Sequence, residues 1–168
     1  GPHQLLPHLW RPPDLVVILT DVLKAIVAIL FGVWIAKMIV VGDGVTGVVL
    51  ARYWAGLFCL LGHMFPCMFH FKGGKGILSG GASHYDRLAH RLVVWGGFLI
   101  LAILTKYVSL GSCWAGASFP FATWFVYHNV IITVLGAVIG CLILYMHRGN
   151  IHRLLTGTEN KFSLHKKK

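Results

Sequence analysis

Apolar runs about as long as a bilayer is thick dominate this chain. A membrane-spanning helix needs about 20 predominantly apolar residues, and most of the runs approach or exceed that length. The runs are 15–41, 45–69, 92–105, 108–126 and 128–146. Charged residues make up 12% of the chain, against about 25% in an ordinary soluble domain. We therefore predict an all-α, multi-pass membrane helix bundle that forms a single domain over residues 1–168.

The charge of the chain is strongly positive. Fifteen Lys and Arg residues against five Asp and Glu residues give a net charge of +10. The basic residues gather between the apolar runs and in the tail at 165–168, as the positive-inside rule expects. A nucleic-acid partner would require a basic face on a soluble fold, so we expect membrane lipid and no nucleic acid. The four cysteines lack metal-ligand spacing, so we expect free thiols and no metal.

The basic segments also predict a topology. Segments 70–91 and 147–168 are rich in Lys and Arg and are predicted to be cytoplasmic, whereas the joints at 42–44 and 127–128 contain neither residue type. Lys106 also favours the cytoplasmic side. Between the loop around residue 75 and Lys106, the chain must then cross the membrane an even number of times. Only one apolar run is visible there, so we predict a disrupted sixth span near 77–91.

Three motifs carry groups suited to an anionic substrate. The loop FKGGKG (71–76) combines lysines with glycines that let backbone N–H groups approach an anion, although it lacks the spacing of a P-loop. The segment YVSLGS (107–112) offers two hydroxyl groups. The segment NIHRLLTGTE (150–159) places two polar residues on one helical face.

Each motif has a simpler interpretation: a cytoplasmic turn, serines bonded back to their own helix, or a terminus anchored on lipid headgroups. All three motifs are predicted on one membrane face. Together they predict a site for an anionic substrate.

With GHMFP (62–66), these motifs resemble, in order and spacing, the bacterial acyl-phosphate:glycerol-3-phosphate acyltransferase family (PlsY type). The resemblance implies a seven-helix enzyme of the bacterial plasma membrane with its active site facing the cytoplasm. It would transfer a fatty acyl group from acyl phosphate to the 1-hydroxyl of glycerol 3-phosphate, giving lysophosphatidic acid and phosphate. We expect no cofactor and a monomer.

The motifs and the resemblance together assign the site residues. We expect substrate binding by Gly73, Gly74, Lys75, Gly76, Ser109, Ser112, His147, Asn150 and Arg153. Further candidates are His63, Lys72 and Glu159. The alternative for His63 is packing at a helix end, and the alternative for Arg153 is a lipid headgroup. No residue is assigned as a general base, because the substrate's own phosphate can take the proton.

The family pattern is not complete in this sequence. In the family a first helix and a motif resembling SGNxGxTNxxRTxG precede a helix with DxLKG, and residues 21–25 (DVLKA) match only the last of these. We therefore expect an N-terminally incomplete domain. Two alternatives remain: a non-catalytic remnant of the family, and a small anion transporter, which would need polar residues through the bilayer core.

Both anomalous segments change character when their codons are shifted by one base. Residues 1–10 can then encode GxTNxxRTxG, and residues 84–91 can encode an apolar segment. We hypothesise single-base slips at these two places; a polar insertion in a diverged homologue is the alternative. Sequencing the gene across codons 1–14 and 82–91 decides between them. Slips that restore the motif support the hypothesis, and codons that encode every residue as printed refute it.

Overall fold

A bundle of α-helices makes up the structure, a computed structural model that describes residues 12–39, 44–65, 74–76 and 88–161. The elements in chain order are α1 (Pro12–Ile39), α2 (Gly44–Met64), α4 (Leu88–Arg91), the π-helical turn η3 (Leu92–Gly96), α5 (Gly97–Thr105), α6 (Val108–Tyr127), α7 (Val130–Met146) and α8 (Arg148–Leu155). These residues contain no β-strand, so the prediction of an all-α fold is confirmed for this part of the chain.

Fewer helices qualify as membrane spans than the five predicted. Within the described residues, three stretches are long and apolar enough, namely Leu19–Met38, Thr46–Met64 and Leu88–Thr105. A fourth is added if α7 and α8, which are bent by 60° at their junction, count as one broken span. Helix α6 has sufficient length, but its Gly, Ser, Thr, Trp, Pro and Tyr residues lower its mean hydropathy. It packs against α4, α5, α7 and α8, so protein rather than lipid surrounds much of its surface.

The third span begins earlier than the sequence predicts. Elements α4, η3 and α5 follow one another without a break, so Leu88–Arg91 extends the apolar run 92–105 instead of belonging to a separate span. One of the two polar residues in this extension, His90, is accommodated inside the bundle: it is 1% exposed and its Nε2 lies 3.3 Å from Thr123 Oγ1 on α6. The remainder of the predicted disrupted span, 77–87, lies outside the described residues.

The two flanks of that segment lie at opposite ends of α6. Lys75 contacts Asn150, which also contacts Ser109 near the start of α6, whereas His90 contacts Thr123 near its end. At 1.5 Å per residue, these ends are about 20 Å apart. Lys75 and Lys106 therefore share one end of the bundle, as the sequence predicts.

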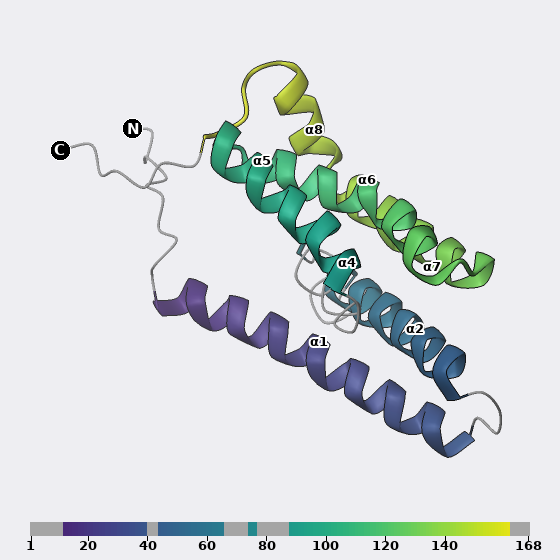
Figure 1. Cartoon of the computed structure of the whole chain (residues 1–168). Coiled ribbons are helices and arrows are strands. Elements are labelled where there is room, and N and C mark those ends of the chain that lie inside the picture. Colours follow the sequence, from purple (N-terminus) through teal and green to yellow (C-terminus); the bar gives the residue numbers. More distant parts are fainter. Residues whose placement is uncertain (1–11, 40–43, 66–73, 77–87, 162–168) are drawn as a thin grey trace.

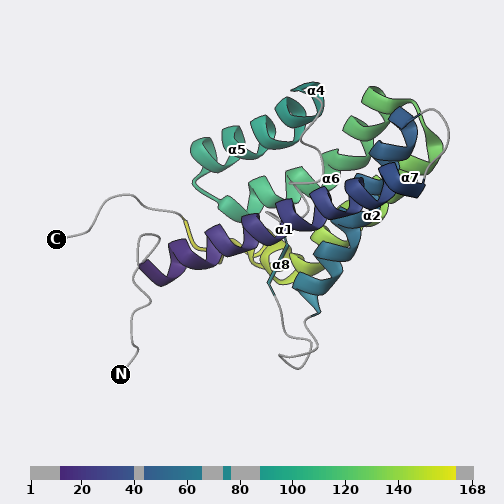
Figure 2. The same cartoon turned by 90° about the horizontal axis from the view of Figure 1, so that it is seen from below.

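The helix ends next to the two joints predicted on the other membrane face lie at one end of the bundle. Figure 1 shows the α6–α7 joint at the same end as the C-terminus of α1 and the N-terminus of α2, with α8 at the opposite end. The view from below in Figure 2 shows the same separation.

A close approach between α6 and α7 forms the centre of the bundle. Because Pro120 has no N–H group, it cannot donate the usual helical hydrogen bond to the Gly116 carbonyl one turn earlier. That carbonyl faces Gly140 on α7, where a Cβ would lie only 2.4 Å from the Gly116 oxygen. Small residues at such a crossing let two helix backbones approach closely, which is how helices associate within a membrane.

Helix α1 lies at the edge of the bundle and packs on α2. Gly32 meets Ala55 there, in a space where a Cβ would be 2.7 Å from the alanine methyl group. The other faces of α1 expose apolar side chains, with Leu30 63% and Met38 70% exposed, as expected for a surface solvated by lipid. Helix α2 ends at Met64, before the predicted limit at residue 69, because Pro66 disfavours helical geometry at the preceding residue.

The cysteines within the described residues are free. Cys59 and Cys113 are half-buried and Cys141 is exposed. The fourth cysteine, Cys67, lies outside the described residues.

Because Gly116 and Gly140 approach so closely, we expect one added methyl group at this contact to lower the stability of the protein. In Gly140→Ala, the added Cβ meets a backbone oxygen that cannot move without moving α6, so we expect destabilisation of about 1–3 kcal/mol. Gly96→Ala is the matched control, because nothing lies within 4 Å of a Cβ there. Unfolding of the detergent-solubilised protein measures both variants. Equal stability of the two variants would contradict the close approach.

Candidate functional site

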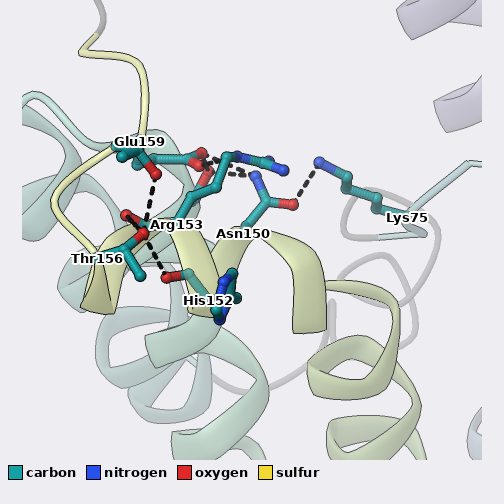
Figure 3. A network of polar contacts seen from close by, with 8 residues as sticks. Lys75, Asn150, His152, Arg153, Thr156 and Glu159 are labelled. Carbon is teal, nitrogen blue, oxygen red and sulfur yellow. Dashed lines mark hydrogen bonds and ion pairs between the residues drawn. The ribbon is translucent and has the colours of Figure 1, made fainter.

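Three motifs that are far apart in the sequence meet at the end of the bundle that carries α8. Lys75 Nζ donates to Asn150 Oδ1 at 2.7 Å, and Asn150 Nδ2 donates to Ser109 Oγ at 2.8 Å. Figure 3 shows Lys75 reaching from its loop to Asn150 on α8. The network therefore joins the glycine-rich loop, the start of α6 and the helix that follows α7.

The chemistry of the partners fixes the orientation of the Asn150 amide. An ammonium group can only donate, so the amide oxygen faces Lys75 and the amide nitrogen faces the acceptors on its other side. That nitrogen donates both to Ser109 and to Glu159 Oε1, the latter at 2.8 Å. Asn150 is 6% exposed. A buried amide with all of these bonds made holds its neighbours in one arrangement.

A helix-terminating turn brings Glu159 back to the site. Thr158 N–H donates to Arg153 C=O and Gly157 N–H donates to Leu154 C=O, which together form a Schellman motif at the end of α8. Gly157 has φ of +68°, a conformation that favours glycine. The reversed chain places Glu159 Oε2 2.6 Å from Arg153 Nε, and Ser109 donates to the other carboxylate oxygen.

Glycines also place Lys75 in its loop. Gly76 has φ of +71° and lies so close to α2 that a Cβ would meet Leu60 at 2.2 Å. Gly74 N–H donates to the carbonyl of His63 at 3.2 Å. The backbone on both sides of Lys75 thus lies against the last turns of α2, and this packing directs the lysine side chain toward α8.

The other expected site residues have different surroundings. Ser112 is buried and donates to Val108 C=O at 3.1 Å, within its own helix, so among the two serines it is Ser109 that takes part in the network. His147 is 3% exposed and its Nδ1 donates to Ile143 C=O at 2.8 Å, which leaves a lone pair on Nε2. Lys72 and Gly73 lie outside the described residues.

Sequence reasoning assigned no role to two other groups. Asp21 and Lys24 form a polar cluster with His63. Their charges within an apolar run, at helical spacing, are the sequence signal that could have revealed this cluster. The positive φ of Gly157 is likewise not among the predictions, although a glycine directly after a polar helical segment commonly marks the end of a helix.

The two basic side chains of the site, Lys75 and Arg153, differ in whether their partner is charged. Burial raises the pKa of Glu159, but hydrogen bonds from Ser109, Asn150 and Arg153 outweigh it, so the pKa lies below its ordinary value and the group is a carboxylate at neutral pH. This carboxylate pairs with Arg153. Lys75 has an uncharged partner in Asn150, so that contact leaves its charge unneutralised and two of its N–H groups available for the oxygens of an anion.

In the part of the chain that the structure describes, no group of three or more His, Cys, Asp or Glu side chains is placed to hold a metal ion. Besides the Glu159 carboxylate, the site carries the Lys75 ammonium and the Arg153 guanidinium, groups that suit phosphate oxygens. The fold and the site together define an apolar helix bundle of the membrane-embedded kind, with a polar site that carries basic side chains at one end.

The comparisons with known proteins identify the family. The family model described as glycerol-3-phosphate acyltransferase matches residues 6–157. A glycerol-3-phosphate acyltransferase of Gloeobacter violaceus is 35% identical over 168 residues, covering 96% of this chain and 76% of the relative. This chain belongs to the glycerol-3-phosphate acyltransferase family.

Other relatives match over a smaller share of their length. A glycerol-3-phosphate acyltransferase of Fusobacterium nucleatum is 39% identical over 64% of this chain, and the chain spans 56% of that relative. A crystal structure of PlsY (YgiH), an integral membrane glycerol 3-phosphate acyltransferase in its lysophosphatidic acid form, superimposes with a TM-score of 0.75 and 30% identity. That match covers 93% of this chain and 76% of the PlsY chain.

The lowered pKa of Glu159 predicts a pH-dependent contribution to stability. A carboxyl group with a depressed folded-state pKa stabilises the fold above its unfolded value, near 4.5, and loses this contribution as the pH falls through the folded-state value. We expect Glu159→Gln to melt below the wild type at pH 7, with the difference shrinking below about pH 4. Thermal unfolding across pH measures it. A difference that persists unchanged at low pH would contradict the carboxylate's role.

Proposed function

We propose that this chain transfers a fatty acyl group from acyl phosphate to the 1-hydroxyl of glycerol 3-phosphate. The observation that carries the proposal is the Lys75–Asn150–Ser109 network, which assembles three family motifs at one end of the bundle. The PlsY structures to which this chain is similar are described as a lysophosphatidic acid form and a glycerol 3-phosphate form. The product proposed here is likewise lysophosphatidic acid.

Both substrates of this reaction carry phosphate, and the site offers groups that suit it. Lys75 and the backbone at Gly76 bind a phosphate group, with the Gly74 N–H held by the His63 carbonyl, while Ser109 and Asn150 orient the glycerol part. Acyl phosphate is already activated, so holding the two substrates in reactive geometry supplies much of the rate enhancement. Hydrogen-bond donors near the developing oxyanion add to it.

The chemical step needs no covalent enzyme intermediate. The glycerol hydroxyl oxygen attacks the acyl carbonyl carbon, and an ester C–O bond forms while the bond from that carbon to the phosphate oxygen breaks. The departing phosphate takes the hydroxyl proton. The side chains around the site bind and orient, and none of them is assigned as the base.

We infer that the site faces the cytoplasm of a bacterial plasma membrane. Lys75, Lys106, Arg148 and Arg153 lie at the site's end of the bundle, and such an excess of basic residues marks the cytoplasmic side. The whole chain then acts as one membrane-embedded domain. A monomeric enzyme is part of the same proposal.

Acyl transfer by the purified protein tests the proposal. The wild type is assayed in detergent with glycerol 3-phosphate and either acyl phosphate or acyl-CoA, and we expect product only with acyl phosphate. In Lys75→Met, loss of a charge-assisted hydrogen bond is expected to raise the KM for glycerol 3-phosphate about 10- to 100-fold.

Lys37→Met is the control for removing one positive charge, because this exposed residue lies in the last turn of α1. Unchanged kinetics in Lys75→Met would refute its role in binding phosphate. A folded wild type that transfers no acyl group to glycerol 3-phosphate would refute the proposed function and support a non-catalytic remnant.

A further inference from the structure

A second polar cluster joins α1 to α2 beside the glycine-rich loop. Lys24 Nζ lies 2.6 Å from Asp21 Oδ1 on the same helix and 2.7 Å from His63 Nδ1 on α2. All three residues belong to stretches that qualify as membrane spans. Each lies within the six residues at one end of its span, and ionisable residues within spans are rare and typically functional. Residues of this kind inside a span therefore call for a role beyond solubility.

The cluster fixes the protonation of the histidine ring. Lys24 can only donate, so Nδ1 of His63 accepts and the ring proton resides on Nε2. A doubly protonated ring would direct an N–H group at the ammonium. Asp21 orients the lysine from its other side, and its Oδ1 lies 3.6 Å from the same ring nitrogen. The three side chains thus set both the tautomer and the orientation of the ring.

The oriented ring lies directly against the loop. A Cβ built on Gly74 would be 2.2 Å from His63 Nε2 and 2.7 Å from Cε1, so the ring occupies the space that any side chain at position 74 would need. The backbone of the same histidine accepts the Gly74 N–H at 3.2 Å. His63 therefore supports Gly74 through both its ring and its carbonyl, one residue before Lys75.

We propose that Asp21, Lys24 and His63 are positioning residues that act through Gly74 to hold Lys75 in reach of Asn150. This inference rests on the proposed function, in which Lys75 binds substrate phosphate. Helix α1 packs at the edge of the bundle, yet by this arrangement it controls the geometry of a site in which it holds no ligand. It also explains why the charged residues Asp21 and Lys24 occur in the first third of the apolar stretch Leu19–Met38.

A double-mutant cycle on His63 and Gly74 tests the contact. Gly74→Ala forces a methyl group into the ring and shifts the loop, so we expect the KM for glycerol 3-phosphate to rise about tenfold with a smaller change in kcat. His63→Ala removes the ring and opens that space. The double variant is therefore expected to have a lower KM than Gly74→Ala alone. A KM in the double variant equal to or above that of Gly74→Ala would overturn the proposal.

Tryptic cleavage after Lys75 provides a readout that does not depend on catalysis. In Lys24→Met the ring loses its orienting donor, so we expect cleavage at Lys75 to be several-fold faster than in the wild type, as measured by mass spectrometry of the fragments. Lys37→Met, on the same helix, is the matched control and should cleave at the wild-type rate.

The two readouts separate the possible failures. If Lys24→Met raises the KM while cleavage at Lys75 is unchanged, Lys24 contacts the ligand itself and the positioning proposal is wrong. If neither quantity changes, the cluster has no influence on the loop and the proposal is also wrong. If the wild type transfers no acyl group, the proposed function fails, and the cleavage rates still decide whether the cluster holds the loop.

Discussion

The hydrogen bond from Lys75 to Asn150 is the contact on which the site depends. It is the point where the loop after α2 meets α8. Between these two elements the described sequence contains α4, η3, α5, α6 and α7. The bond orients the Asn150 amide, and the amide in turn holds Ser109 and Glu159. Among the described residues, the lysine has no carboxylate partner. A site that binds phosphate needs both features: rigid neighbours and a positive charge that is not already neutralised.

The rest of the bundle places the two partners of this bond. The Gly116–Gly140 approach draws α7 against α6, and the 60° bend after α7 turns α8 across the end of the bundle. The Schellman turn at Gly157 then returns Glu159 to Arg153. On the other side, α2 supports the loop through Gly74 and Gly76. Small residues and glycines with positive φ thus determine where the charged side chains meet.

Much of this could be predicted from the sequence, because helical spans and basic loops leave strong local signals. The apolar runs predicted the helix bundle, and the motifs predicted Lys75, Asn150 and Ser109 as site residues. The predicted count of five spans plus a disrupted sixth is not confirmed: among the described residues three stretches qualify, or four if α7 and α8 count as one broken span. The pairing of Lys24 with His63 could not be predicted, since it depends on how two helices pack. The amide orientation of Asn150 likewise follows only from its neighbours in space.

Binding of glycerol 3-phosphate to the purified protein tests the central claim most directly. Isothermal titration in detergent compares glycerol 3-phosphate with glycerol, which lacks the phosphate group. The account predicts saturable binding of one glycerol 3-phosphate per chain, no detectable binding of glycerol, and weaker binding of glycerol 3-phosphate when Asn150 is replaced by Ala. Equal affinity for the two ligands, or an Asn150→Ala variant that binds as tightly as the wild type, would contradict an anion site built on the Lys75–Asn150 contact.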